Sequence, residues 1–293
     1  MVSTMKKIIG HQRQVQFLHH QLQEDNLAQV YLFVGPPFIG KFTLAQNLAQ
    51  TLLRTEEEAL RLHPDFLLIS QSEEAISIET ILELQRKISL KPVASSKKIV
   101  IIEEASRMTL DAQNAFLKTL EEPPAYLLFF LIAQRESLLP TILSRCQRLY
   151  FQPLARREIE TAGFSPFLAH LSQGQIGRLF LDPRLAEKWQ GVLEHLSALI
   201  EANLKDKMDY FRNRSEEDLF FLRAIFRTLL YWQIQPEFLS FYPQKAKERL
   251  TGLARRLTLE QVIEMLDSLE EIESLSWTNV NQKLLLEGLA LKI

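Results

Sequence analysis

The stretch from Ile99 to Cys146, which reads IVIIEEASRMTLDAQNAFLKTLEEPPAYLLFFLIAQRESLLPTILSRC, decides the fold. It opens with an apolar run that ends on two carboxylates, Glu103 and Glu104. A helical segment that stops at L-E-E-P-P follows, and a second apolar run then leads to the tripeptide S-R-C. Short apolar runs separated by an amphipathic helix are typical of buried strands in a parallel sheet.

A third apolar run lies upstream and ends in a glycine loop. Residues 30–34 read as a buried strand, and G-P-P-F-I-G-K-F-T follows from Gly35 to Thr43. A helix expected over residues 42–53 would aim its N-terminal N–H groups into this loop, where phosphate binds readily. A strand, a glycine loop, a helix and a later strand that ends in acidic residues are the layout of a P-loop nucleotide site.

Other segments complete an α/β domain. Helical spacing predicts further helices over residues 11–24, 77–90 and 109–121, with Ser77 and Thr109 as N-caps and Leu110 among the inward side chains. The five expected strands cover residues 30–34, 66–69, 99–102, 127–132 and 148–151. Because strands alternate with helices, we expect a five-stranded parallel sheet covered on both faces.

The character of the sequence changes at Pro153, after which helical patterns dominate. A small helical unit that contains G-Q-I-G-R is expected over residues 153–184, with a break at Asp182-Pro183. Amphipathic stretches at 187–204, 216–232 and 259–276 predict an all-α domain over residues 185–293. The apolar face that begins at Phe220 is expected to form the core of a helix bundle.

Composition narrows the class of protein. The 293 residues are 46% hydrophobic and 24% charged, which is ordinary for a globular protein, and a net charge of -2 gives no overall attraction to nucleic acid. The single cysteine, Cys146, excludes an internal disulfide and a multi-cysteine zinc site. No apolar stretch approaches the roughly 20 residues that span a bilayer, and residues 1–10 do not resemble a signal peptide. We expect a cytoplasmic protein.

The glycine loop departs from the working pattern G-x-x-x-x-G-K-[ST]. Three consensus residues are present: Gly35, Gly40 and Lys41. Phe42, however, replaces the hydroxyl that binds Mg²⁺, and Thr43 lies one position later, which is about 100° round the helix. Phe38 adds a bulky side chain where positive φ is costly, so the phosphate nest is expected to be distorted.

The acidic pair departs in the same way. Glu103 stands where an Asp usually holds Mg²⁺, and its extra methylene fits a small octahedral site poorly, whereas Glu104 is kept. We therefore expect a vestigial site in which hydrolysis is lost and ATP or ADP binding is weak or absent. Its residues would be Gly35, Gly40, Lys41, Thr43, Glu103 and Glu104. A chance match in an ordinary strand–turn–helix is the alternative, and the order of the two motifs argues against it.

Three strings carry a family resemblance: residues 97–109 (KKIVIIEEASRMT), 114–124 (NAFLKTLEEPP) and 138–147 (LLPTILSRCQ). Together they resemble the bacterial clamp-loader ATPase family, and the shorter strings at 8–11 (IIGH), 63–66 (HPDF) and 88–92 (ISLKP) fit it too. The likeness covers about residues 8–153, and G-Q-I-G-R extends it weakly. Within that family the chain is similar to the subunits that have a degraded nucleotide site but keep S-R-C.

The resemblance implies an AAA+ domain over residues 1–152, a helical lid over 153–184 and a helical collar over 185–293. It implies a place in a five-subunit ring with motor subunits (gamma/tau) and delta, which loads the sliding clamp on primed DNA for DNA polymerase III. Two alternatives remain open. One is an ATP-hydrolysing motor subunit, and the other is an AAA+ protein that keeps ATP as a structural ligand.

The resemblance also assigns roles to individual residues. Arg145 is expected to be an arginine finger given in trans to the ATP of a neighbouring subunit, with Ser144 and Cys146 shaping the turn. The alternative is that Arg145 caps a helix end or forms a surface ion pair. Residues 54–62 contain no cysteine, so no zinc is expected, and Ala133-Gln134 is a poor sensor of nucleotide. Three basic residues could face DNA or solvent: Lys97, Lys98 and Arg107.

Overall fold

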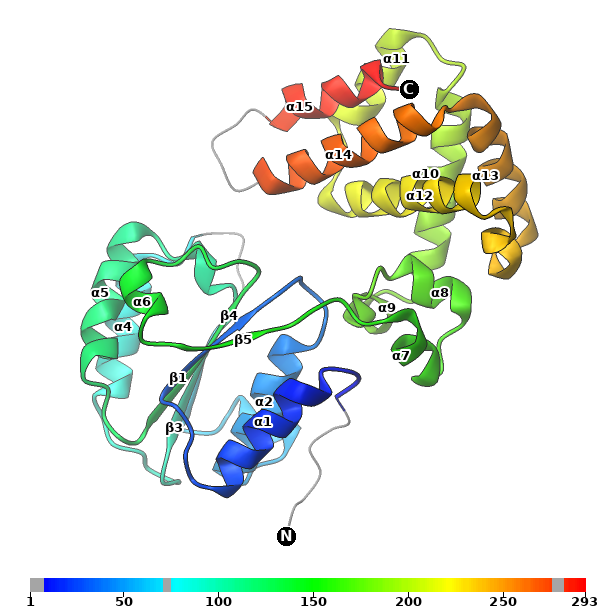
Figure 1. Cartoon of the computed structure of the whole chain (residues 1–293). Coiled ribbons are helices and arrows are strands. Elements are labelled where there is room, and N and C mark those ends of the chain that lie inside the picture. Colours follow the sequence, from blue (N-terminus) through cyan, green and yellow to red (C-terminus); the bar gives the residue numbers. More distant parts are fainter. Residues whose placement is uncertain (1–7, 71–74, 276–281) are drawn as a thin grey trace. The chain divides into compact units, whose positions relative to one another are not determined.

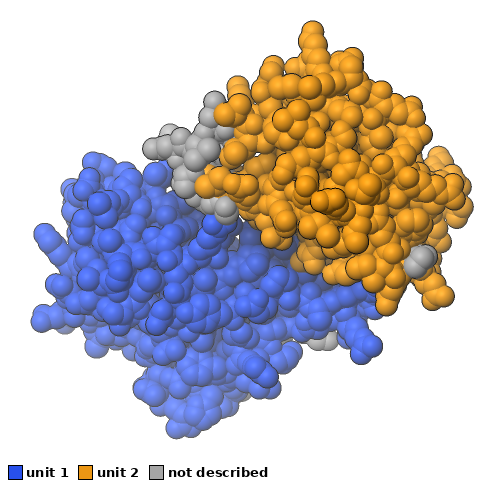
Figure 2. Space-filling model, turned by 45° about the horizontal axis from the view of Figure 1, so that its top comes forward, with its two compact units in different colours: residues 1–163, 174–177 blue, residues 164–173, 178–293 orange. Residues whose placement is uncertain are grey.

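The computed structural model describes residues 8–70, 75–275 and 282–293, so most of the stretch examined for a signal peptide lies outside it. The chain forms two compact units (Figure 2). Unit 1 contains residues 1–163 and 174–177, and unit 2 contains residues 164–173 and 178–293. The division at residues 152 and 184 stays a prediction. None of the helices in the described residues is long and apolar enough to cross a membrane.

Unit 1 is built on a five-stranded parallel sheet, as the sequence predicts. Its strand order is β2-β3-β4-β1-β5. The strands are β1 (Val30–Val34), β2 (Phe66–Ile69), β3 (Lys98–Ile102), β4 (Leu127–Ala133) and β5 (Gln147–Tyr150). Each boundary falls within one residue of the predicted one. For β1 and β4 the reason is that strands covered on both faces are continuous apolar runs, whereas β5 is largely exposed.

Helices cover both faces of this sheet (Figure 1). One face is covered by α4 (Ile78–Ile88) and α5 (Leu110–Glu121), and the other by α1 (Gln12–Gln23), α2 (Lys41–Leu53) and α3 (Glu57–Leu60). The remaining elements of unit 1 are η1 (Ala105–Arg107), α6 (Pro140–Leu143) and α7 (Arg156–Thr161). The side chains of Ser77 and Thr109 accept N–H groups at the starts of α4 and α5, as predicted.

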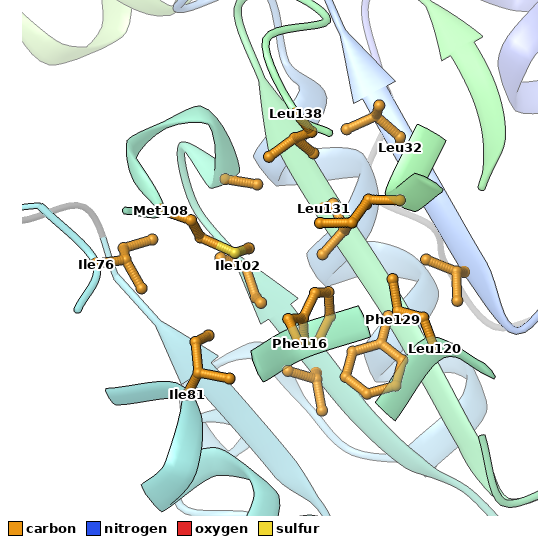
Figure 3. Packing of buried hydrophobic residues seen from close by; sticks show 14 of the residues in the cluster. Leu32, Ile76, Ile81, Ile102, Met108, Phe116, Leu120, Phe129, Leu131 and Leu138 are labelled. Atoms are coloured by element: carbon orange, nitrogen blue, oxygen red, sulfur yellow. The ribbon is translucent and has the colours of Figure 1, made fainter. Parts of the chain in front are cut away.

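The two faces of β4 contribute side chains to two separate cores. Phe129 and Leu131 of β4 point into the cluster under α4 and α5, where Phe116 packs edge-on against Phe129 with ring centroids 5.4 Å apart (Figure 3). Phe130, between them, points into the cluster under α1 and α2. Truncating a buried phenylalanine such as Phe116 to alanine costs roughly 3–5 kcal/mol, so the sheet is a rigid support for the loops at its edges.

Two predicted side-chain positions are wrong. Leu110, expected to face inward, is 61% exposed, because it is the first residue after the Thr109 cap and lies on the solvent side of α5. Lys98, considered as a DNA-facing residue, is buried, and its Nζ donates to the carbonyls of Lys87 (3.1 Å) and Leu90 (2.7 Å). Its ammonium therefore satisfies the carbonyl end of α4.

The described part of unit 2 is helical, as predicted. Its elements, together with α9 (which begins in unit 1), are α8 (Pro166–Leu171), α9 (Ile176–Leu181), α10 (Leu185–Leu199), α11 (Leu204–Arg212), α12 (Glu216–Ile234), η2 (Pro236–Phe241), α13 (Gln244–Arg256), α14 (Leu259–Leu275), α15 (Gln282–Gly288) and η3 (Leu289–Leu291). The apolar face of α12 is buried, from Phe220 to Leu222 and again at Ile225 and Phe226. The predicted helix-bundle core is therefore confirmed.

Candidate nucleotide loop and S-R-C motif

The glycine loop between β1 and α2 keeps an unusual backbone. Gly35 has φ of 152°, and a Cβ there would lie 2.2 Å from the carbonyl oxygen of Phe151, so only glycine fits. Gly40 has φ of 101°. Phe38 also takes positive φ, at 59°, despite its bulk, and its side chain is 41% exposed. A non-glycine residue held there costs on the order of 1 kcal/mol, so its surroundings must hold it.

Two motifs that are remote in the sequence hold this loop. The carbonyl of Phe38 accepts a hydrogen bond of 2.7 Å from the N–H of Gly177, which belongs to G-Q-I-G-R. The carbonyl of Ile39 accepts from Nε2 of His11 at 2.8 Å, in I-I-G-H. Burial lowers the pKa of His11 below its ordinary value, which favours the neutral ring with its proton on Nε2. The glycine loop is therefore held by one residue near the beginning of the unit 1 sequence and one near its end.

Lys41 is turned onto the loop itself. Its side chain is buried, and Nζ donates to the carbonyls of Gly35 and Pro36, the latter at 2.5 Å. Burial lowers the pKa of Lys41 to about 8, although the negative charge of Glu104 works against this shift. In a working P-loop the lysine reaches the outer phosphates. Here its hydrogen bonds go to the chain's own backbone.

Glu104 is likewise engaged by neighbouring groups. It sits at positive φ (52°) just after β3, and its carboxylate is buried. One oxygen accepts from Ser106 Oγ and from the backbone N–H of Gln134 (3.3 Å), and the other accepts from Nε2 of Gln134 (3.1 Å). Gln134, expected only to be a poor sensor, thus ties Glu104 to the end of β4. A carboxylate held in this way is poorly placed to polarise water.

Three further residues of the predicted site have other surroundings. Thr43 is on the exposed side of α2, so its hydroxyl does not take the place of the missing one. Phe42 packs against the core under α1 and α2. Glu103 is half-buried, and its N–H donates to the carbonyl of Ile69 at 2.9 Å, which joins the ends of β3 and β2. Lys41 and Glu104 are close enough for the charge of Glu104 to act on Lys41.

The S-R-C side chains gather at the end of α6. Arg145 Nη1 and Ser144 Oγ both donate to the carbonyl of Thr141, at 2.9 and 3.0 Å, and Cys146 Sγ lies 3.2 Å from the carbonyl of Ile142. The free carbonyls of a helix end are satisfied in this way. Arg145 Nη2 also lies 3.7 Å from a carboxylate oxygen of Glu121. Arg145 thus caps a helix end and forms a surface ion pair in the isolated chain.

Arg145 lies at the opposite edge of the sheet from the glycine loop. It precedes β5 by two residues, and Gln147 at the start of β5 pairs with Tyr31 of β1. Gly35 follows Tyr31 by four residues, which is about 13 Å along an extended strand. Arg145 is therefore too far to contact a phosphate in its own loop, and its half-exposed guanidinium faces outward.

The Cys146 thiol and the Asp65 carboxylate lie at this edge of the sheet, and neither is available for catalysis. Burial raises the pKa of the Cys146 thiol to about 12, so it is not a nucleophile at neutral pH. Asp65, in H-P-D-F, is fully buried, and its carboxylate accepts the N–H groups of Val93, Ala94 and Ser95 at 2.7–2.9 Å. The sequence does not reveal this role, because the three N–H groups lie 28–30 residues further along the chain. Within the described residues no cluster of His, Cys, Asp or Glu could hold a metal ion.

Comparisons with known proteins find relatives among subunits of bacterial DNA polymerase III. A family model described as "DNA polymerase III, delta subunit" matches residues 10–155. DNA polymerase III subunit delta' of Bacillus subtilis is 29% identical, over 96% of this chain and 95% of that protein. The delta' subunit of Pseudomonas aeruginosa is 35% identical, over 41% of this chain and 42% of that protein. Subunit tau/gamma of Haemophilus influenzae is 30% identical, over 68% of this chain but only 30% of that protein.

Proposed function

This chain belongs to the AAA+ clamp-loader family, as a subunit of a bacterial DNA polymerase III clamp loader, and on that premise we propose that it is the delta-prime subunit. The match to the Bacillus delta' subunit extends over nearly the whole of both chains. The match to a tau/gamma subunit leaves most of that longer protein uncovered. Similarity over nearly the whole of the Bacillus delta' subunit favours delta-prime over a motor subunit.

We propose further that the chain does not hydrolyse ATP. The observation that carries this proposal is the pairing of Lys41 with the loop carbonyls and of Glu104 with Gln134. A bound nucleotide would have to displace these contacts, and the Mg²⁺-binding hydroxyl would still be missing at Phe42. The vestigial site therefore serves as a brace between β1, β3 and β4. No zinc and no nucleotide are required for this role.

Arg145 is proposed to act on a neighbour. A planar guanidinium can hold two oxygens of a transferring phosphoryl group and neutralise the charge that develops there. Supplied in trans, such a finger is worth roughly 10³–10⁵ in rate. The outward exposure of Arg145 and its distance from its own loop support this role. The neighbour would be a gamma/tau motor subunit.

The other proposed partners follow from membership of a clamp loader. The delta subunit would complete the ring, and the sliding clamp and primed DNA would be engaged through the whole complex. A net charge of -2 agrees with indirect contact with DNA, because any direct contact would need a local basic patch. Burial of Lys98 removes one of the three basic residues considered for such a patch.

The first test is binding and turnover of MgATP by the purified chain. We expect no turnover, since the chain lacks the Mg²⁺-binding hydroxyl. Steady hydrolysis would instead identify a motor subunit. Tight binding without turnover would mean that the loop keeps nucleotide as a structural ligand.

The finger is tested by Arg145→Ala in the clamp loader reconstituted from the subunits of the same organism. We expect hydrolysis at the neighbouring site to fall by about 10³-fold or more, so total ATPase falls by that site's share. Arg148→Ala is the matched control, because Arg148 is also exposed and pairs only weakly with Glu136, at 3.4 Å. Equal rates for the two variants would refute the finger.

A further inference from the structure

We propose that Glu121, in L-E-E-P-P, is a positioning residue that presents the guanidinium of Arg145 to the nucleotide of the neighbouring subunit. This inference rests on the proposed function of Arg145. It gives L-E-E-P-P and S-R-C one shared task, although the first motif lies at the end of α5 and the second follows α6. The ground for it is that α5 supports α6 at both of its ends.

At the start of α6 the support is a buried amide. The side chain of Gln113 in α5 is almost fully buried; its Oε1 accepts the N–H of Leu139 at 2.8 Å, and its Nε2 donates to the carbonyl of Met108 at 3.0 Å. A buried amide with both ends bonded holds its partners in fixed places. The first turn of α6 is therefore anchored to α5.

At the end of α6 the support is Glu121. Its backbone is fixed, because Leu120 before it is buried and the two prolines after L-E-E end the helix. Gln29 then donates to the carbonyls of Pro123 (3.1 Å) and Pro124 (2.9 Å), which pins the turn to the start of β1. The backbone that bears the Glu121 carboxylate is thus fixed, while the side chain is 59% exposed.

Two contacts restrict the guanidinium of Arg145. Nη1 is bonded to the carbonyl of Thr141 on α6, and Nη2 faces the carboxylate of Glu121 on α5. A free arginine samples many rotamers, whereas a catalytic group acts best when it is in position before its substrate arrives. Holds on two different nitrogens keep the guanidinium at the edge of the sheet and pointing away from its own loop.

The ion pair is also weak enough to permit catalysis. The oxygen and nitrogen are 3.7 Å apart, and both side chains are partly exposed to water. Such pairs contribute little free energy, so a triphosphate with several negative oxygens can draw the guanidinium from Glu121. Glu121 therefore orients the guanidinium of Arg145 and still allows it to move to the triphosphate.

The test is Glu121→Ala in the reconstituted clamp loader, measured as kcat and KM for ATP. We expect turnover at the neighbouring site to fall about two- to fivefold, the range that an exposed ion pair can supply, so the kcat of the complex falls by part of that site's share, with KM unchanged. Glu122→Ala is the matched control, since Glu122 is exposed and forms no ion pair within the described part of the chain; its kcat should stay at the wild-type value. The thermal midpoint of both variants should also match the wild type.

A double variant separates positioning from a general structural effect. If Glu121 acts through Arg145, then Glu121→Ala added to Arg145→Ala lowers kcat no further. An additional loss in that background, an unchanged kcat in Glu121→Ala, or a raised kcat would each overturn the inference. An Arg145→Ala complex as active as the wild type would instead overturn the proposed function on which the inference rests.

Discussion

At the scale of single residues, the most informative group is Lys41, because a lysine is rarely buried unless it is paired. Here the ammonium is buried against two carbonyls of its own loop, and its pKa is lowered to about 8. Burial disfavours the charged form more than the nearby carboxylate of Glu104 favours it. At neutral pH folded Lys41 is charged although it is buried. This lowers the free energy of unfolding by an amount that depends on pH.

The dependence can be measured with Lys41→Met. Between pH 8 and the ordinary pKa of 10.5, the unfolded chain holds a proton that folded Lys41 has released, so the free energy of unfolding rises with pH. Wild type should gain about 3 kcal/mol over this range relative to Lys41→Met, which cannot titrate. Urea unfolding at several pH values from 7 to 10.5 checks this. Parallel curves for the two proteins would show that Lys41 is not desolvated.

Phe38 shows where residue-level prediction stops. The sequence indicates that a bulky side chain resists positive φ and distorts the loop, and the structure does place Phe38 at φ of 59°. What holds it there is the N–H of Gly177 and the neighbouring bond from His11 to Ile39. Those partners are far from the loop in sequence, so local steric rules reveal the strain but not its support.

At the scale of elements, strands were easier to predict than short helices. Strands buried on both faces are apolar throughout, so β1, β3 and β4 are visible as runs of hydrophobic letters. The helices α3 and α6 have only four residues each, which is too short for a 3.6-residue period to show. The S-R-C motif lies just after α6, so its cap geometry could not be read from periodicity.

The link between H-P-D-F and the loop before β3 is a second element-scale feature. Asp65 precedes β2 and accepts three backbone N–H groups and the hydroxyl of Ser95, so it fixes residues 93–95. In Asp65→Asn an amide donor would face these donors. We expect a loss of about 2–3 kcal/mol in urea unfolding, because hydrogen bonds to a charged group are lost. Asp267→Asn, an exposed control on α14, should stay within about 0.5 kcal/mol of wild type.

The same carboxylate predicts a response to acid. Burial by itself raises the pKa of Asp65, but the bonds from Val93, Ala94 and Ser95 outweigh it and lower the pKa below 3.8. The stabilisation is complete above that ordinary value and is lost as pH falls through the lower folded pKa. The stability gap between wild type and Asp65→Asn should therefore narrow below pH 4. A constant gap down to pH 2 would contradict this account.

At the scale of the whole molecule, the chain passes between its two units three times, and the short return of residues 174–177 to unit 1 explains the glycines of G-Q-I-G-R. Gly174 has φ of 83°, and a Cβ there would lie 2.5 Å from the Cβ of Pro153. The next residue after Gly177 already belongs to unit 2, where the guanidinium of Arg178 lies 3.9 Å from the ring centre of Phe220. The sequence predicted a helical unit here, but not that adjacent residues are anchored in different units.

Gly177 is the residue at which this organisation can be tested. A Cβ at this position would lie 2.8 Å from the carbonyl oxygen of Phe38, which is backbone and cannot swing away. Gly177→Ala should therefore lower the free energy of unfolding by about 1–3 kcal/mol and speed amide hydrogen exchange at residues 36–40, because the brace on the glycine loop is pushed off. Gly191→Ala is the control: it lies inside α10 with no atom within 4 Å of its added Cβ, and should gain about 0.5–1 kcal/mol. If exchange in the loop stayed at the wild-type rate in Gly177→Ala, the return segment would not be what holds Phe38 in its strained conformation.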